Sequence, residues 1–234
     1  MKPNSVYPKK ARTFVKKLQG QLVRQALRLT GRLHPELAAQ KAEGLFLTPR
    51  RMPANRHQQQ VLDRGSQGLV QVGGDIVRVW RWGHGPGVLL VHGWSGRGSQ
   101  FADWVDQLVE AGFQVTLFDA PGHGDSGGQS SSLAQFVATI EEIARHFGPF
   151  EILIGHSMGG AAGLAAIARG VSLQQLVTLA APGDLAAVMR RTFQGLMGLA
   201  PELNPLIERR LEARFGIPMH SLDPKALAPE VELP

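Results

Sequence analysis

The chain has 234 residues, a net charge of +6 and 43% apolar residues. This length is enough for one α/β domain with a large hydrophobic core. The sequence contains no cysteine, which excludes disulfides, a cysteine nucleophile and cysteine-ligated zinc or iron–sulfur centres.

The positive charge is concentrated near the N-terminus. Residues 1–56 contain thirteen Lys or Arg and two acidic residues, Glu36 and Glu43, a net charge of +11, whereas residues 57–234 carry −5. An amphipathic helix is predicted over residues 11–33, because apolar residues recur there every three or four positions. These residues are Phe14, Leu18, Leu22, Ala26, Leu29 and Leu33.

Two interpretations of this helix differ in the partner they imply. We expect it to pack on the rest of the protein with its basic face in solvent, since a run of charges is usually a solvated face. The alternative is a helix that lies on an anionic membrane surface. We expect no nucleic-acid binding, because the segment contains no known reader motif.

No apolar stretch approaches the roughly 20 residues of a membrane-spanning helix. The leucine-rich part, residues 18–33, is interrupted by Arg24, Arg28 and Arg32, so it lacks the apolar run of a signal peptide. We therefore expect a cytoplasmic protein.

The pattern changes at about residue 69. Residues 49–66 are predicted to be a linker, so we expect a basic helical extension with its linker over residues 1–66 and an α/β domain over residues 67–234. In that domain apolar runs alternate with helical patterns, which predicts a mostly parallel sheet with helices on both faces. The expected strands are 69–72 and 76–82, joined by a glycine hairpin turn, then 88–92, 114–118, 151–154 and 176–179, and the expected helices are 100–110, 133–147 and 158–168.

The strongest functional signal is Gly155-His156-Ser157-Met158-Gly159, between a predicted strand and a predicted helix. A serine on such a sharp turn projects its hydroxyl above the sheet, where it can act as a nucleophile. Gly155 and Gly159 leave room for the turn and for close packing of the helix on the strand. Ser157 is therefore the candidate catalytic residue.

A second motif, His92-Gly93-Trp94, follows the buried strand 88–92. An oxyanion hole needs two converging backbone N–H groups, one of them from the residue after the nucleophile. The candidate donors are therefore Met158 and Trp94. We expect His92 to be structural, holding its loop by hydrogen bonds.

Together with residues 119–126, Asp-Ala-Pro-Gly-His-Gly-Asp-Ser, these motifs make the chain resemble the α/β-hydrolase superfamily over roughly residues 70–230. The resemblance implies an eight-stranded sheet, a helical cap, for which residues 184–215 are the candidate, and a Ser–acid–His triad. It implies no metal and no organic cofactor.

The sequence departs from that pattern after Ser157. His220 is the only later histidine, and Asp184 and Asp223 are the later aspartates, none of them in the expected strand–turn context. We expect His220 to be an exposed loop residue, Asp184 to cap the next helix, and His123 and His156 to be structural. The sheet is therefore expected to be incomplete at its C-terminal end. Without a triad acid and base we expect the chain to have little activity. We also expect copies of the chain to associate through the exposed edge of the sheet.

The leading functional hypothesis is a serine hydrolase of the esterase type, which acts on a small acyl substrate through an acyl-enzyme at Ser157. The alternative is a non-catalytic, truncated or degenerate hydrolase that serves as a binding protein. Transfer of the acyl group to an alcohol other than water would use the same half-site.

Overall fold

A six-stranded sheet, in the order β1-β2-β4-β3-β5-β6, runs through the computed structural model, which describes the backbone of residues 9–233 and the side chains of residues 20–233. Its strands are β1 (Ser66–Val72), β2 (Asp75–Trp82), β3 (Gly87–Val91), β4 (Gln114–Phe118), β5 (Ile152–His156) and β6 (Gln175–Leu179). Strands β4, β3, β5 and β6 are parallel, and β2 pairs antiparallel with both β1 and β4. The predicted mostly parallel α/β sheet is confirmed.

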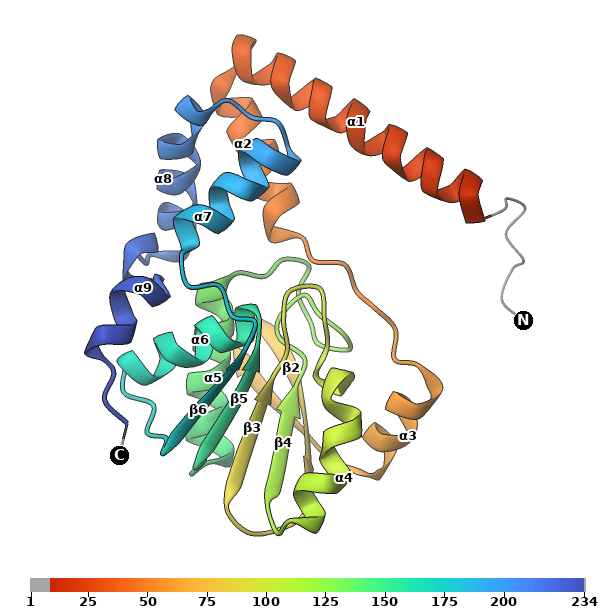
Figure 1. The fold of residues 1–234 in the computed structure, drawn as a ribbon, viewed down its shortest axis with the longest axis vertical. Helices are drawn as coiled ribbons and strands as arrows, with labels where there is room; N and C mark the ends of the chain where they lie inside the picture. Colours follow the sequence, from red (N-terminus) through yellow and green to blue (C-terminus); the bar gives the residue numbers. More distant parts are fainter. Residues whose placement is uncertain (1–8, 234) are drawn as a thin grey trace. The chain divides into compact units, whose positions relative to one another are not determined.

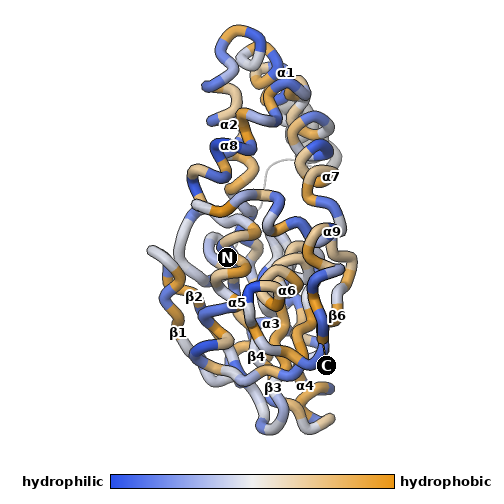
Figure 2. The backbone as a smooth tube through the Cα atoms, turned by 90° about the vertical axis from the view of Figure 1, so that its left-hand side faces the viewer, coloured by the Kyte–Doolittle hydropathy of each residue, from blue (hydrophilic) through white to orange (hydrophobic). Residues whose placement is uncertain are grey.

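Helices cover both faces of this sheet (Figure 1). Helices α5 (Leu133–Phe147) and α6 (Met158–Ala168) pack on one face. Helices α3 (Arg56–Arg64) and α4 (Ala102–Glu110), with the 3₁₀ turn η1 (Gly98–Phe101), pack on the other. Every residue of β3 is buried, as expected for a strand between two helical layers, and Figure 2 shows hydrophobic residues along the strands and α6.

The prediction that residues 49–66 form a linker is wrong for residues 56–64, which form α3. Asn55 caps α3 through a reciprocal hydrogen-bond pair with Gln58, and Val61 and Leu62 of α3 are buried in the core. The indole N–H of Trp82 also donates to the Val61 carbonyl at 3.2 Å. The sequence of α3 is almost wholly polar, so its two apolar residues give no periodic signal, and only the contact with the sheet reveals the helix.

The chain divides into two compact units at points other than the expected boundary at residue 66. One unit comprises Met1–Phe46 and Ala186–Arg214, and the other comprises Leu47–Leu185 and Phe215–Pro234. The first, here called the helical unit, contains α1 (Lys9–Leu33), most of α2 (Pro35–Leu47) and α7 (Leu185–Met189), the π-helix η2 (Arg190–Leu196), η3 (Pro201–Leu203) and most of α8 (Asn204–Phe215). The expected cap segment thus belongs with the N-terminal helices.

A buried carboxylate joins the two parts of the helical unit. Glu43 of α2, nearly inaccessible to solvent, accepts hydrogen bonds from Arg210 at 2.8 Å and from Arg214 at 3.3 Å, both on α8. The rings of Phe46 and Phe193 also join the two segments of this unit, with centroids 4.9 Å apart. Such a pair requires both partners, since a lone buried carboxylate is strongly destabilising.

The helix predicted over residues 11–33 is present as α1, but the packing expected for its apolar face is not observed. Leu22, Leu29 and Leu33 are 56%, 60% and 65% exposed, whereas Leu27, outside the predicted row, is 6% exposed. The side chains of Phe14 and Leu18 lie outside the described residues. None of the described helices is long and apolar enough to cross a membrane.

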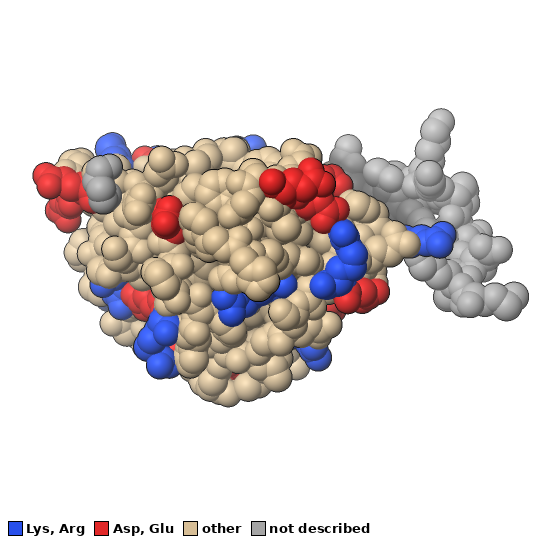
Figure 3. Space-filling model, turned by 90° about the horizontal axis from the view of Figure 1, so that it is seen from below, with Lys and Arg blue, Asp and Glu red and all other residues tan. Residues whose placement is uncertain are grey.

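Strand β6 lies at one edge of the sheet, and Val177 on it is exposed. The segment after α8 turns back onto α6, through η4 (Met219–Leu222), α9 (Pro224–Leu227) and η5 (Ala228–Glu230), and buries Leu222 in the core. The position of β6 at the edge agrees with the expectation that the sheet ends at the strand 176–179. Self-association of the chain through this edge remains a prediction. Figure 3 shows that basic and acidic groups are interspersed on this face of the molecule, between larger areas that carry neither.

The burial of α3 predicts that Leu62→Ala lowers the free energy of unfolding by about 2–5 kcal/mol, because it leaves a cavity in the core. Gln60→Ala, at an exposed position of the same helix, should change it by less than about 0.5 kcal/mol. Urea unfolding followed by circular dichroism measures both values. Equal midpoints for the two variants would show that α3 is not part of the core.

Candidate functional site

Ser157 lies in the turn between β5 and α6 with a backbone conformation that non-glycine residues rarely adopt. Its φ is 51° and its ψ is −121°. Its N–H donates to the Leu179 carbonyl at 2.8 Å, and its own carbonyl accepts from Gly160 N–H at 3.0 Å. Strain of this kind persists only where surrounding contacts hold it, and it is concentrated at functional sites.

Two glycines make this turn possible, as the sequence predicted. A Cβ at Gly155 would lie 2.5 Å from the Cα of Gly160, and one at Gly159 would collide with the carbonyl oxygen of Val91. Any side chain at either position would force α6 away from β3 and β5. The two glycines therefore bring the start of α6 close to the ends of these strands.

The loop after β3 runs directly beside Ser157. A Cβ added to Gly93 would lie 3.0 Å from the Cβ of Ser157 and 2.8 Å from Nδ1 of His156. Met158 is the first residue of α6, so its N–H is among the amide groups that a helix leaves without an internal acceptor. The structure thus brings together the two segments from which oxyanion donors were predicted.

His92 and His123 hold the loops around Ser157 together. Nε2 of His92 accepts a hydrogen bond from Ala120 N–H at 2.9 Å, and Nε2 of His123 accepts one from Ser95 N–H at 3.0 Å. The proton of each neutral ring therefore lies on Nδ1, which donates to the carbonyl of Gly93 in His92 (2.8 Å) and to that of Pro121 in His123 (3.0 Å). The structural role predicted for His92 is confirmed.

Burial favours the neutral form of both imidazoles. Loss of solvation lowers the pKa of His92 and that of His123 from 6.5 to about 4. The two rings pack with centroids 4.9 Å apart, and Trp94 packs edge-on against His123 at 5.3 Å. Because each Nε2 is occupied by a backbone N–H, neither ring is arranged to accept a proton from Ser157.

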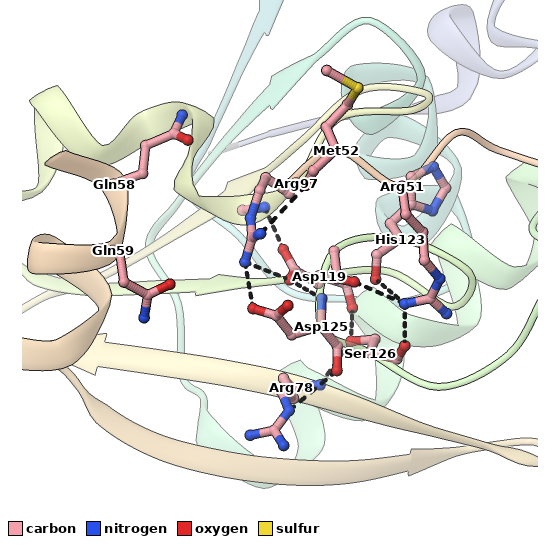
Figure 4. Close-up of polar contacts among 12 residues, drawn as sticks. Arg51, Met52, Gln58, Gln59, Arg78, Arg97, Asp119, His123, Asp125 and Ser126 are labelled. Atoms are coloured by element: carbon pink, nitrogen blue, oxygen red, sulfur yellow. Dashed lines mark hydrogen bonds and ion pairs between the residues drawn. The ribbon is translucent and has the colours of Figure 1, made fainter. Parts of the chain in front are cut away.

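A buried carboxylate, Asp119, fixes the loop at residues 119–128. It accepts hydrogen bonds from the N–H groups of Gly98 and Asp125, both at 2.7 Å, and from the Arg97 guanidinium at 3.4 Å. Arg97 also pairs with Asp125 at 2.5 Å (Figure 4). Burial raises the pKa of Asp119, and these hydrogen bonds together with the Arg97 charge oppose that rise.

Arg51 closes the same loop from a segment that the sequence predicted to be a linker. Its guanidinium donates to five backbone carbonyls between His123 and Gly128, the shortest contacts being 2.5 Å to Gly128 and 2.7 Å to Gly124 and Ser126 (Figure 4). An arginine in a Pro-Arg-Arg run carries no signal for this role. Neither Arg51 nor Arg97 was predicted from the sequence as a residue of this site.

The candidate acids and bases do not converge on Ser157. Among the described residues, no histidine or carboxylate forms a hydrogen bond with its hydroxyl. His220 is exposed on η4, as expected, and Asp223 caps α9 through Lys225 N–H at 3.1 Å. His156 is partly exposed, and its Nδ1 is buried without a hydrogen-bond partner. No residue is assigned to the acid or the base of a triad.

A cavity of about 480 Å³ lies away from Ser157. It is lined by residues at the end of β2, including Trp82, and by Gln114 at the start of β4. It is thus at the amino-terminal edge of the parallel strands, opposite Ser157. Within the described part of the chain, no three His, Asp or Glu side chains are grouped to hold a metal ion.

The lowered pKa values of His92 and His123 predict a pH-dependent stability. Above about pH 6.5 both rings are neutral in the folded and the unfolded chain, so they have no effect. As the pH falls from 6.5 toward 4 only the unfolded chain gains the protons, and each histidine lowers the free energy of unfolding by roughly 1.4 kcal/mol per pH unit, up to roughly 3 kcal/mol.

Urea unfolding of the wild type and of His123→Gln between pH 7 and pH 5 tests this. The glutamine oxygen retains an acceptor for Ser95 N–H but does not titrate, so the dependence should fall by about half. An unchanged pH dependence would contradict the assignment.

Comparison with known proteins gives results consistent with this geometry. Over 101 residues the chain is 37% identical to the pimeloyl-[acyl-carrier protein] methyl ester esterase of Xanthomonas campestris pv. campestris strain B100, covering 42% of this chain and 38% of that protein. The esterase of the same name from Chromobacterium violaceum is 40% identical over 78 residues, 33% of this chain and 30% of that one. The chain thus spans about two fifths or less of the length of these relatives.

Similarity also extends to solved structures. The epoxide hydrolase from Vigna radiata is 20% identical, with a TM-score of 0.49 over 57% of this chain and 48% of that one. The model of the alpha/beta hydrolase family matches residues 88–232, which is more than half of the chain and includes Gly93, Asp119 and Ser157. On that match, the protein belongs to the α/β hydrolase family.

Proposed function

We propose that this protein hydrolyses carboxylic esters through an acyl-enzyme formed on Ser157. The observation that carries the proposal is the strained turn at Ser157, with φ of 51°, beside the backbone of Gly93. A serine in this position projects from the sheet at the start of a helix, where the helix dipole favours negative charge. The names of the two relatives, both methyl ester esterases, further support an ester as the bond that is hydrolysed.

In the proposed reaction, the Ser157 oxygen attacks the ester carbonyl carbon while its proton passes to a base. The carbonyl oxygen becomes an oxyanion that accepts hydrogen bonds from the N–H groups of Met158 and Trp94. Collapse of this intermediate breaks the bond to the alcohol, which leaves with a proton. Water then attacks the acyl-enzyme and releases the carboxylic acid, which restores Ser157.

The rest of the site contributes by positioning. The side chains of Arg51, Arg97 and Asp119 and the two neutral imidazoles hold the loop at residues 119–128 and tie it to the loop that contains Gly93. A donor placed about 1 Å from its correct position can reduce the rate roughly a hundredfold. The proposed substrate class is an ester of a carboxylic acid with a small alcohol. The relatives' names suggest a methyl ester.

The role of Ser157 is tested by covalent labelling of the full chain with a fluorophosphonate probe. Wild-type protein and Ser172→Ala, which changes an exposed serine in the loop before β6, should be labelled equally. Ser157→Ala should not be labelled, and its hydrolysis of p-nitrophenyl butyrate should fall to no more than the residual rate that the oxyanion hole and binding support without the nucleophile. Labelling of Ser157→Ala at the wild-type rate would refute the assignment. A wild-type chain without labelling or turnover would favour a non-catalytic binding protein.

The close approach of Gly93 to Ser157 gives a second prediction. Gly93→Ala places a methyl group 3.0 Å from Ser157 Cβ, so the loop must shift, and kcat/KM for p-nitrophenyl butyrate should fall by roughly a hundredfold or more. Gly74→Ala is the matched control, since a Cβ there meets no atom within 4 Å. Both variants should retain the wild-type circular dichroism spectrum. Wild-type kcat/KM in Gly93→Ala would contradict an oxyanion hole built from this loop.

A further inference from the structure

We propose that α1 is a membrane-surface helix whose exposed leucine row enters the interface of an anionic lipid bilayer. The leucine row comprises Leu22, Leu29 and Leu33. Their spacing of seven and four residues places them on one face of the helix. The proposal concerns α1 alone and is independent of the chemistry at Ser157.

The leucine row lies on a face of α1 that the helical unit does not cover. All three side chains are more than half exposed, and Val23 beside them is 47% exposed. An amphipathic helix that packs on its own protein buries such a row. In this structure the row is left in solvent, at a cost in free energy that burial against another apolar phase would remove.

A different face of α1 makes the contacts with the helical unit. Leu27 is buried, and a Cβ at Gly31 would lie 3.2 Å from Leu203. The stem of Arg24 packs at Gly198, where an added Cβ would lie 2.7 Å from Arg24 Cγ. Leu27 is five residues after Leu22 and therefore roughly 140° away around the helix. The helical unit and a bilayer can thus occupy different sides of α1 at the same time.

The charge of α1 matches an anionic partner. The segment Lys9–Leu33 contains eight Lys or Arg and no Asp or Glu. Arg28 and Arg32 are exposed on the described part of the helix, between the leucine row and the face that contacts the helical unit. Figure 2 shows hydrophobic and hydrophilic residues following one another along α1, as an amphipathic helix requires.

The leucine row and the basic residues of α1 together indicate which partner binds this helix. A nucleic acid would satisfy the cations but leave the leucine row in water. A neutral apolar surface would cover the row but leave the cations without counter-charges. An anionic bilayer offers lipid phosphates to the arginines and acyl chains to the leucines, which is the pattern of interfacial amphipathic helices.

The proposal is tested by co-sedimentation of the full chain with vesicles of phosphatidylcholine, with and without phosphatidylglycerol. Binding should be strong only with phosphatidylglycerol and should weaken as salt is added. Leu29→Gln should weaken binding by roughly tenfold or more. Leu69→Gln is the matched control, because Leu69 on β1 is 62% exposed and Leu29 is 60% exposed. Replacing Arg28 and Arg32 by glutamine should reduce the preference for phosphatidylglycerol, since the other basic residues of the helix remain.

A spectroscopic measurement makes the test independent of binding strength. The fluorescence of a Leu29→Trp variant should be quenched by brominated lipid in anionic vesicles, beyond the quenching of the native tryptophans, and that of Leu69→Trp should not. Equal binding to both kinds of vesicle, or equal effects of Leu29→Gln and Leu69→Gln, would overturn the proposal. So would a change of oligomeric state in Leu29→Gln on size-exclusion chromatography with unchanged vesicle binding, because the row would then be a contact between copies of this chain.

Discussion

The close approach of the start of α6 to the ends of β3 and β5 is the constraint on which the candidate site depends. Gly159 has no room for a side chain against Val91, and Gly155 has none against Gly160. This contact turns the chain sharply at Ser157 and forces its positive φ. The same contact brings the loop at Gly93 beside Ser157, so the strained residue and the neighbouring backbone N–H groups result from one packing requirement.

A buried polar network maintains that arrangement from the other side. Asp119 and the two neutral imidazoles bond mainly to backbone N–H and carbonyl groups of the loops. A buried donor or acceptor without a partner is costly, so each bond resists displacement of its loop. Arg51 adds bonds to carbonyls more than 70 positions away in the sequence. Residues outside the motifs thus contribute to the rigidity of the site.

The two units use charge and apolar surface differently. The unit that carries Ser157 encloses its apolar residues between helices and sheet, and its buried charges belong to the network around Asp119. The helical unit buries Glu43 against two arginines but leaves a leucine row in solvent. The esterase and membrane proposals rest on separate units, and their experiments fail independently.

The sequence by itself determined the alternation of strands and helices from residue 69 to residue 179 and the turn at Ser157. These features are encoded locally, in hydrophobic periodicity and in glycines whose neighbours along the chain define the turn. It also determined the existence of α1, whose apolar residues recur with helical spacing. His92 was recognised as structural because its place after a buried strand is itself a local feature.

Only the tertiary structure decided which surfaces meet. The inclusion of α3 in the core, the bonds of Arg51 and Arg97, and the packing of α1 through Leu27 and Gly31 instead of its leucine row all depend on residues distant in the chain. Periodicity shows that a helix has an apolar face, but the partner of that face is set by long-range contacts. The same limit explains why Arg51, in a polar segment, gave no indication that it holds the loop at residues 119–128.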